Sequence, residues 1–413
     1  MSLPLSKLAE ASFLIDQPLI AGIRRYLSNP YSENNPTGVI NLGTAENQLM
    51  QPELLPKLNE LSAALVSPEM LSYGLFHGSN DLFAAFLNRH LNPVVPIDPA
   101  EEVTIQSGCT STVNNIIQAL TNPGDGVLIP TPYYGGFDFD TRMYAQAKIV
   151  EVPTSRESDF TVTVADLDAA MIRASEQGVA VKVFLLANPQ NPQGTIIGKE
   201  HLLELLQWCA DKQIHAIVDE IYALSIFGDK EFVSVLSIPE LPDPTNTHVL
   251  WGISKDLALN GFRMGVCITR HKSLQVAMRN FCLMTNISSV SDRLMTRLLS
   301  DTEWMDWFVA ENKKRLRAQY ERTTVLLDSL GIKYLASDST FFIYMDLHHM
   351  LDPTIADKTE AESKLWKDMM DRGVVLSPGF AFHNPEPGWF RLVFTLEWKK
   401  LELGIQRAFG NSA

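Results

Sequence analysis

The sequence contains few cysteines and no long uninterrupted apolar segment. Cysteine occurs at four of 413 positions, and the spacing matches no metal-ligand motif: Cys109, Cys209, Cys267 and Cys282. We therefore expect reduced thiols that pack as small apolar groups, without disulfides or a metal site. Charged residues and Pro18 interrupt the apolar stretches near the N-terminus. We expect neither a signal peptide nor a membrane span, and a cytoplasmic protein.

Positive charge is also scarce. Lysine and arginine together number 34, against 48 aspartates and glutamates, and the formal net charge is -14. A nucleic acid would meet an unfavourable overall field, which argues against it as a partner. Hydrophobic residues make up 46% and charged residues 20%, as in folded globular proteins. A chain of this length usually forms more than one domain.

Short apolar runs recur between residues 100 and 270, and several are followed by segments with helical periodicity. The runs lie at residues 101–106, 126–132, 147–153, 181–189, 215–220, 247–254 and 264–270. This alternation predicts an α/β fold with a mainly parallel sheet that helices cover on both faces. Ligands of such sheets bind beyond the carboxyl ends of the strands, so the residues after each run are the candidates for a site.

The pattern changes near residue 300. Residues 301–331 predict one long helix, with Asp301 as its N-cap and Gly331 at its C-terminal end. Strand-like runs at residues 341–347 and 389–395 then indicate a smaller α+β domain. We divide the chain into an N-terminal arm with part of the small domain (1–48), a large domain (49–297) and a C-terminal small domain (298–413).

Polar side chains of complementary chemistry follow the apolar runs. Residues 107–111 open a helix, where free backbone N–H groups favour an anion. Asn191 lies in a proline-rich turn. Asp219 ends a buried run and precedes Tyr222, and a carboxylate there is costly to bury unless a cation faces it. A capped helix, turn chemistry and an ordinary ion pair would explain these features taken singly.

Lys255, Arg263 and Tyr134 complete the set of strand-end residues. Lys255 follows the run at 247–252, and Tyr134 follows the run at 126–130. An amine forms an imine with an aldehyde, and an aspartate pairs with a protonated ring nitrogen. A helix N-terminus and an arginine bind phosphate, and an aromatic side chain stacks on a ring. Together these groups meet the requirements of pyridoxal 5'-phosphate (PLP).

The chain resembles the fold-type I PLP enzymes of the class I/II aminotransferase superfamily, and within it the 1-aminocyclopropane-1-carboxylate (ACC) synthase group. The resemblance covers nearly the whole chain, through motifs at residues 38–49, 129–138, 188–195, 219–222, 254–265 and 385–394. It implies an aminotransferase-like fold, with a mainly parallel seven-stranded sheet in the large, PLP-binding domain. It also implies a homodimer with shared active sites.

The resemblance assigns roles around the cofactor ring. Lys255 would hold PLP through an imine bond and then act as the base at the substrate Cα. Asp219 would keep the pyridine nitrogen protonated, and Tyr222 and Asn191 would bond the phenolic oxygen. Tyr134 would stack on the ring face. The expected catalytic residues are therefore Lys255, Asp219 and Tyr222.

The resemblance also assigns a phosphate site. Arg263 and Ser254 would bind the phosphate together with the backbone of Gly108, Cys109 and Thr110. A tyrosine of the second subunit completes this site in the family. Tyr73 is the candidate here, although a gapped alignment places Phe76 at that position.

The substrate site implied by the resemblance lies against the small domain. Arg391 would bind the substrate α-carboxylate as a planar fork. Asn191, Glu46 and Ala45 would also contact the substrate, although Glu46 could equally be an exposed loop residue.

Two positions depart from the ACC synthase pattern. Gly252 replaces the phosphate-binding serine three residues before the imine lysine, so one hydroxyl donor is lost. The segment that carries a substrate-contacting tyrosine in ACC synthases reads Gln17-Pro18-Leu19, which argues against S-adenosylmethionine as the substrate.

All of these enzymes form a Cα carbanion of an α-amino acid, and the fate of that carbanion defines the reaction. Our leading hypothesis is a PLP-dependent lyase of ACC synthase-like type, which cleaves a carbon-sulfur or related bond of an amino acid or conjugate in specialised metabolism. The first alternative is an aminotransferase that transfers the amino group to a 2-oxo acid. The second alternative is a true ACC synthase that uses S-adenosylmethionine. A third hypothesis, from a different functional class, is a non-catalytic regulator. The presence of Lys255, Asp219 and Arg391 argues against it.

Overall fold

The seven apolar runs form the strands of one sheet in this computed structural model, which describes residues 5–6, 9–10 and 18–410. The sheet order is β2-β8-β7-β6-β5-β3-β4. Strand β8 is antiparallel to both of its neighbours, and the other pairings are parallel. The strands are β2 (Val103–Gln106), β3 (Gly126–Pro130), β4 (Lys148–Val152), β5 (Val181–Ala187), β6 (His215–Asp219), β7 (Thr247–Gly252) and β8 (Gly265–Ile268). The predicted mainly parallel sheet is confirmed.

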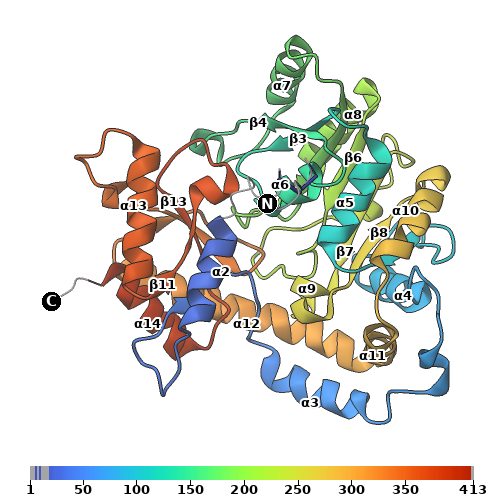
Figure 1. Ribbon diagram of the computed structural model, residues 1–413, viewed down its shortest axis with the longest axis horizontal. Helices are drawn as coiled ribbons and strands as arrows, with labels where there is room; N and C mark the ends of the chain where they lie inside the picture. The colour runs from blue at the N-terminus through green and yellow to red at the C-terminus, as the bar shows by residue number, and fades with distance from the viewer. Residues whose placement is uncertain (1–4, 7–8, 11–17, 411–413) are drawn as a thin grey trace.

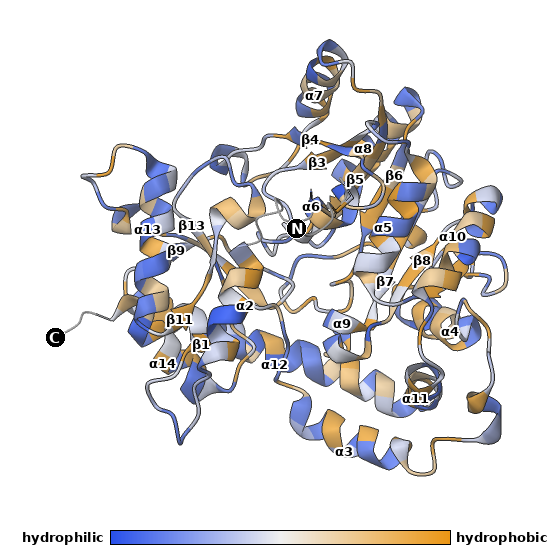
Figure 2. Cartoon of the chain, in the orientation of Figure 1, coloured by the Kyte–Doolittle hydropathy of each residue, from blue (hydrophilic) through white to orange (hydrophobic). Residues whose placement is uncertain are grey.

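Helices cover both faces of this sheet, and this explains why its strands are apolar along their length rather than alternating. One face packs against α5 (Cys109–Leu120), α6 (Gly136–Arg142) and α10 (Lys272–Thr285). The other packs against α4 (Asn80–Leu91), α7 (Val164–Glu176), α8 (Lys199–Lys212) and α11 (Ser289–Ser300), with α3 (Gln51–Ser62) beyond them. Figure 2 shows the central strands as hydrophobic and the outer helices as mixed.

The smaller part of the molecule contains two further sheets. Four antiparallel strands follow the order β12-β13-β10-β9, and β1 pairs in parallel with β11. The strands are β1 (Ile40–Asn41), β9 (Lys333–Tyr334), β10 (Phe342–Asp346), β11 (Val374–Val375), β12 (Ser377–Pro378) and β13 (Trp389–Val393). The helices are α2 (Pro18–Ser28), α13 (Lys358–Asp371) and α14 (Trp398–Phe409). The N-terminal α2 and β1 thus lie beside the C-terminal segments, as Figure 1 shows.

Helix α12 (Thr302–Ser329) joins the two parts. The side chain of Asp301 caps it by accepting a hydrogen bond from the amide of Trp304, and Gly331 has a left-handed φ of 71°, as the sequence predicts. Phe308 belongs to the core of the large sheet, whereas Leu316 belongs to the core of the small domain. Helix α12 therefore contributes to both cores, and the division of the chain at residue 298 stays a prediction.

No helix in the described part of the chain is both long and apolar enough to cross a bilayer.

Candidate active site

A cavity opens at the carboxyl ends of β5, β6 and β7, where the topology places ligands. It encloses about 780 Å³ of space that is continuous with solvent. Most of the predicted cofactor residues line it: Cys109, Thr110, Tyr134, Asn191, Asp219, Tyr222, Ser254, Lys255 and Arg263, together with Ala45. Segments that are far apart in the chain thus converge on one space.

Lys255 reaches this cavity from α9 (Ile253–Asp256), the short helix that follows β7. Its Nζ donates a hydrogen bond to the carbonyl oxygen of Ala45 at 2.7 Å. Burial, and next the positive charge of Arg391, lower the pKa of Lys255 to about 8. The amine is therefore neutral far more often near neutral pH than an ordinary lysine, as a nucleophile requires.

Asp219 ends β6 at the base of the cavity and is 7% exposed. Its Oδ1 accepts a hydrogen bond from the amide of Ile221 at 3.2 Å, and burial raises the pKa of Asp219 to about 7. None of the ion pairs among the described residues involves Asp219. A buried carboxylate in this position fits a cationic group supplied by a ligand.

An anion cradle lies at the N-terminus of α5. The first amides of this 12-residue helix have no carbonyl of a preceding turn to bond, so they are available to a phosphate. The guanidinium of Arg263 lies against Gly108: a Cβ at that position would be 2.4 Å from Nη2 of Arg263. The φ of 86° favours glycine at this position, and any Cβ there would also displace the guanidinium of Arg263.

Two tyrosines line the cavity, and neither phenol forms a hydrogen bond to another described residue that would compete with a ligand. Tyr134 packs edge-on against Phe137, with ring centroids 5.5 Å apart. Burial raises the pKa of Tyr134 to about 12. Tyr222 contacts the edges of Phe341 and Phe342, and burial raises its pKa further above the usual value. Both phenols stay protonated at neutral pH.

Arg391 lies on β13 and is 2% exposed. Its Nη1 donates to Oδ1 of Asn191 and its Nη2 donates to the carbonyl of Gly43, both at 2.7 Å. The guanidinium lies between the rings of Phe342 and Phe382, 4.8 Å from each centroid. Its Nε finds no hydrogen-bond partner among the residues that the structure describes. Arg391 lines a second cavity together with Lys255, so a cation that can bind a carboxylate faces the reactive amine.

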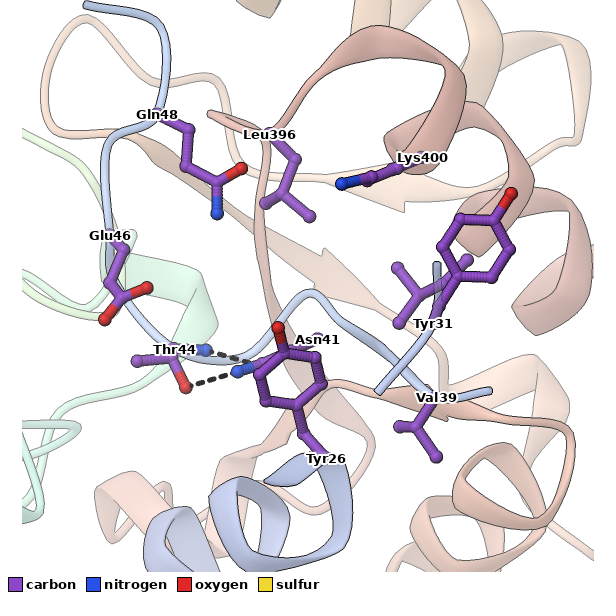
Figure 3. Close-up of a pocket in the computed structure, with 10 residues that line it drawn as sticks. Tyr26, Tyr31, Val39, Asn41, Thr44, Glu46, Gln48, Leu396 and Lys400 are labelled. Atoms are coloured by element: carbon purple, nitrogen blue, oxygen red, sulfur yellow. Dashed lines mark hydrogen bonds between the residues drawn. The ribbon is translucent and has the colours of Figure 1, made fainter. Parts of the chain in front are cut away.

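Two predicted residues lie outside this arrangement. Glu46 lines a separate polar cavity with Tyr26, Asn41 and Lys400 (Figure 3), and that cavity meets the Arg391 cavity only at Thr44. Tyr73 is 94% exposed, and its expected target is the second subunit. Gln17 lies outside the described residues. The roles of Glu46 and Tyr73 stay predictions.

Two polar residues that line the cofactor cavity were not predicted from the sequence. Asp140 lines the cofactor cavity, and burial, followed by the charge of Asp219, raises its pKa. Asn260 donates a hydrogen bond to the carbonyl of Ala45 at 3.3 Å, and its own carbonyl accepts one from Arg263 at 3.0 Å. Asp140 belongs to no apolar run or motif, and Asn260 lies in the motif at residues 254–265 without an assigned role, so the three-dimensional arrangement reveals both.

Gly252, the departure from the serine of related enzymes, is explained by packing. A Cβ at this position would be 2.7 Å from Sγ of Cys109 and 2.8 Å from the carbonyl oxygen of Met264. The thiol of Cys109 donates to the carbonyl of Trp251 at 3.3 Å. The sulfur thus fills space that a serine at 252 would need.

These residues fit PLP: Lys255 for the aldehyde, Asp219 for the ring nitrogen and the Gly108–Arg263 cradle for the phosphate. The fold and the site define a PLP-dependent enzyme of fold type I, and PLP is its cofactor. The family model for aminotransferase class I and II matches residues 37–407. The chain belongs to this family.

Curated relatives share about a third of their residues with this chain. The mouse 1-aminocyclopropane-1-carboxylate synthase-like protein 1 is 35% identical over 94% of this chain and 78% of its own length. Arabidopsis thaliana 1-aminocyclopropane-1-carboxylate synthase 6 is 34% identical over 94% of this chain and 81% of its own. A second mouse protein, named as a probable inactive synthase-like protein 2, is 35% identical over 91% and 66%.

Solved structures show the same fold at lower identity. Thermus thermophilus aspartate aminotransferase with maleate has a TM-score of 0.82 at 22% identity, over 98% of this chain and 99% of that one. The aromatic aminotransferase of Pyrococcus horikoshii has a TM-score of 0.75 at 22% identity, over 94% and 97%. These likenesses confirm the predicted fold class.

Proposed function

We propose that the protein removes the Cα proton of an α-amino acid and then eliminates a sulfur leaving group from its side chain. One observation carries the first part of this proposal. Lys255 and Arg391 face the same cavity, while Asp219 lies at the base of the adjoining cofactor cavity. A base and a carboxylate-binding cation thus flank the position of a substrate Cα.

The chain's own residues supply binding, orientation and proton transfer. Arg391 binds the α-carboxylate, and its contact with Asn191 fixes the orientation of the guanidinium. When bound, PLP withdraws electrons from the Cα of the attached amino acid, and Asp219 holds the proton on the ring nitrogen that this requires. Nζ of Lys255 then removes the Cα proton.

The elimination step balances without an oxidant. The Cα–H bond and the carbon-sulfur bond break, and the leaving thiolate takes the bonding electron pair. Lys255 returns the proton to the sulfur, and water hydrolyses the released unsaturated amine to a 2-oxo acid and ammonia. The similarity to proteins named as ACC synthases and synthase-like proteins supports elimination over transfer.

An aminotransferase is the second candidate function. The name of the matching family supports it, and it uses the same base, the same arginine and the same cofactor site. It differs in one measurable requirement, because amino transfer needs a 2-oxo acid as acceptor. Amino acids or their conjugates are the substrates in either case.

The test is to incubate the holoenzyme with S-alkyl cysteines and with plain amino acids, each with and without a 2-oxo acid. Elimination predicts stoichiometric thiol and ammonia without the 2-oxo acid. The variant Lys255→Ala should lose the activity, while Lys272→Ala, which changes an exposed lysine, should retain it. Product that strictly requires a 2-oxo acid would establish the aminotransferase instead.

We further propose that the protein forms a homodimer with shared active sites. The segment at residues 71–76 exposes Leu71, Tyr73 and Leu75 at 82%, 94% and 70%. Large apolar side chains grouped in this way favour an interface.

A further inference from the structure

Helix α2 forms one wall of the substrate site. The cavity that Lys255 and Arg391 line encloses about 510 Å³. Leu19 and Ile23 of α2 line the same cavity. A further cavity of about 780 Å³ is lined by the same two α2 residues and by Phe380. Tyr134 lines both cavities, so they are neighbours along α2.

Close packing fixes the position of this wall. Gly22 is buried, and a Cβ at that position would be 2.7 Å from Cγ1 of Val375 on β11. Cδ1 of Leu19 lies 4.0 Å from the Cβ position of Gly135, in the large domain. The helix is thus held against the small domain while Leu19 extends towards the large one.

The described residues that line the two cavities offer no free charge for a charged substrate side chain. Among the described residues that line them, the basic ones are Lys255, Arg391 and His383. His383 forms ion pairs with Asp138 and Glu151, and it stacks on Tyr133 with centroids 4.6 Å apart. Since Lys255 and Arg391 are committed to the reacting end of the substrate, a second carboxylate would be buried without a partner.

We infer that Leu19 and Ile23 determine specificity, and that the substrate is an α-amino acid with an extended, uncharged, apolar side chain, such as an alkyl or aryl thioether. This inference rests on the proposed function for the position of the α-carboxylate at Arg391. With that carboxylate bound, the substrate side chain extends along α2, between Leu19 and Ile23 on one side and the ring of Tyr134 on the other. Each added methylene should increase affinity about fourfold while it remains in contact with this wall.

The test measures binding rather than turnover. Dissociation constants of butanoate, hexanoate, octanoate, succinate and glutarate are determined on the holoenzyme by calorimetry. These acids can bind Arg391 but cannot react, because they lack an amino group. The expected result is an affinity that rises along the monocarboxylate series, with both dicarboxylates at least tenfold weaker than hexanoate.

Two α2 variants and a matched control complete the experiment. Leu19→Arg should lower the affinity for octanoate and raise the affinity for glutarate. The milder Leu19→Ala should reduce the dependence of affinity on chain length without adding charge. Leu27→Arg places the same charge on the solvent side of the helix, where Leu27 is 67% exposed. It should change neither the affinity for octanoate nor the affinity for glutarate. Affinities that are independent of chain length, or equal effects of the arginine at positions 19 and 27, would overturn the inference.

These experiments separate a failure of the specificity inference from a failure of the proposed function. Intact elimination with no length dependence refutes the apolar wall alone. Clear length dependence in a holoenzyme that shows no elimination refutes the proposed reaction and leaves the wall supported.

Discussion

Arg391 and Asn191 are joined by a hydrogen bond of 2.7 Å between Nη1 and Oδ1, and this bond links the small domain to the large one at the active site. Arg391 lies on β13, whereas Asn191 follows β5. The carboxylate-binding residue is therefore oriented by the domain that holds the cofactor. Five predictions follow from the geometry of the site.

Substitution of Arg391 by lysine should raise KM with little loss of cofactor. Lysine keeps the charge but loses the planar fork and the bond to Asn191. The loss of charged hydrogen bonds costs about 1.5–3 kcal/mol, so KM should rise roughly 10- to 150-fold. Steady-state kinetics with a PLP titration check this, with Arg317→Lys as the exposed control. An unchanged KM would show that the carboxylate binds elsewhere.

The rate at which the cofactor-free protein binds PLP covalently should follow the titration of a group with a pKa near 8. Only the neutral amine of Lys255 attacks an aldehyde, and this pKa is lowered from its ordinary value by burial. The rate should therefore rise about tenfold per pH unit below 8 and become constant above about 9. Stopped-flow absorbance measures it. A rate that keeps rising to pH 10 would assign Lys255 an ordinary pKa.

Asp219 should make the cofactor-free protein less stable as pH rises. Burial raises its folded pKa to about 7, above that of the unfolded chain. The stabilisation by the bound proton is therefore complete below the unfolded pKa of about 4 and is lost progressively as pH rises to the folded pKa of about 7. The unfolding free energy of the wild type should fall relative to Asp219→Asn between about pH 4 and pH 7, by at most about 1.4 kcal/mol per pH unit, and the difference should be constant above pH 7.

Urea unfolding at about pH 5 and about pH 7 measures this difference. Asp81→Asn changes an exposed carboxylate and should show no such divergence. In the presence of PLP the order should reverse, because asparagine cannot hold the ring-nitrogen proton. Parallel stability curves for wild type and Asp219→Asn would contradict the raised pKa.

Gly252 and Cys109 should behave as a coupled pair. Gly252→Ser alone should lower both stability and PLP affinity, because its Cβ would be 2.7 Å from the sulfur of Cys109. In the Cys109→Ala/Gly252→Ser variant the sulfur is absent, and part of the loss should be recovered. We expect a coupling of about 0.5–3 kcal/mol from a double-mutant cycle. Strictly additive effects would show that the two positions are independent.

Tyr73 should act on the second subunit's phosphate site. Tyr73→Phe should leave a dimer but weaken PLP by roughly fivefold, since one hydrogen bond contributes about 1 kcal/mol. Phe76→Leu should leave the PLP affinity unchanged. Leu71→Glu with Leu75→Glu should produce monomers in sedimentation experiments. A loss of PLP affinity in Phe76→Leu, and not in Tyr73→Phe, would assign the role to Phe76.

Much of the fold could be predicted because its signals are local. Each apolar run is a strand that both faces of the sheet bury, and the side chains after β6 and β7 are placed at one edge by topology alone. Asp219 and Lys255 could therefore be predicted from residues close to them in the chain.

The remaining features depend on contacts between distant segments. The position of Asn260 beside Ala45 and the space that Cys109 shares with Gly252 are set by packing, which one sequence does not display. Glu46 lines a polar cavity that neighbours the Arg391 cavity at Thr44, and its role towards the substrate stays a prediction.

The position of β2 in the sheet has a consequence for biosynthesis. This strand is the first of its sheet in the sequence, yet its partner in the described structure is β8, which begins at Gly265. As the nascent chain leaves the ribosome, β2 must wait until β8 emerges before its backbone can pair. The helix α5 that β2 introduces, and with it the phosphate cradle, should therefore become ordered late in translation, when Lys255 and Arg263 have already been made.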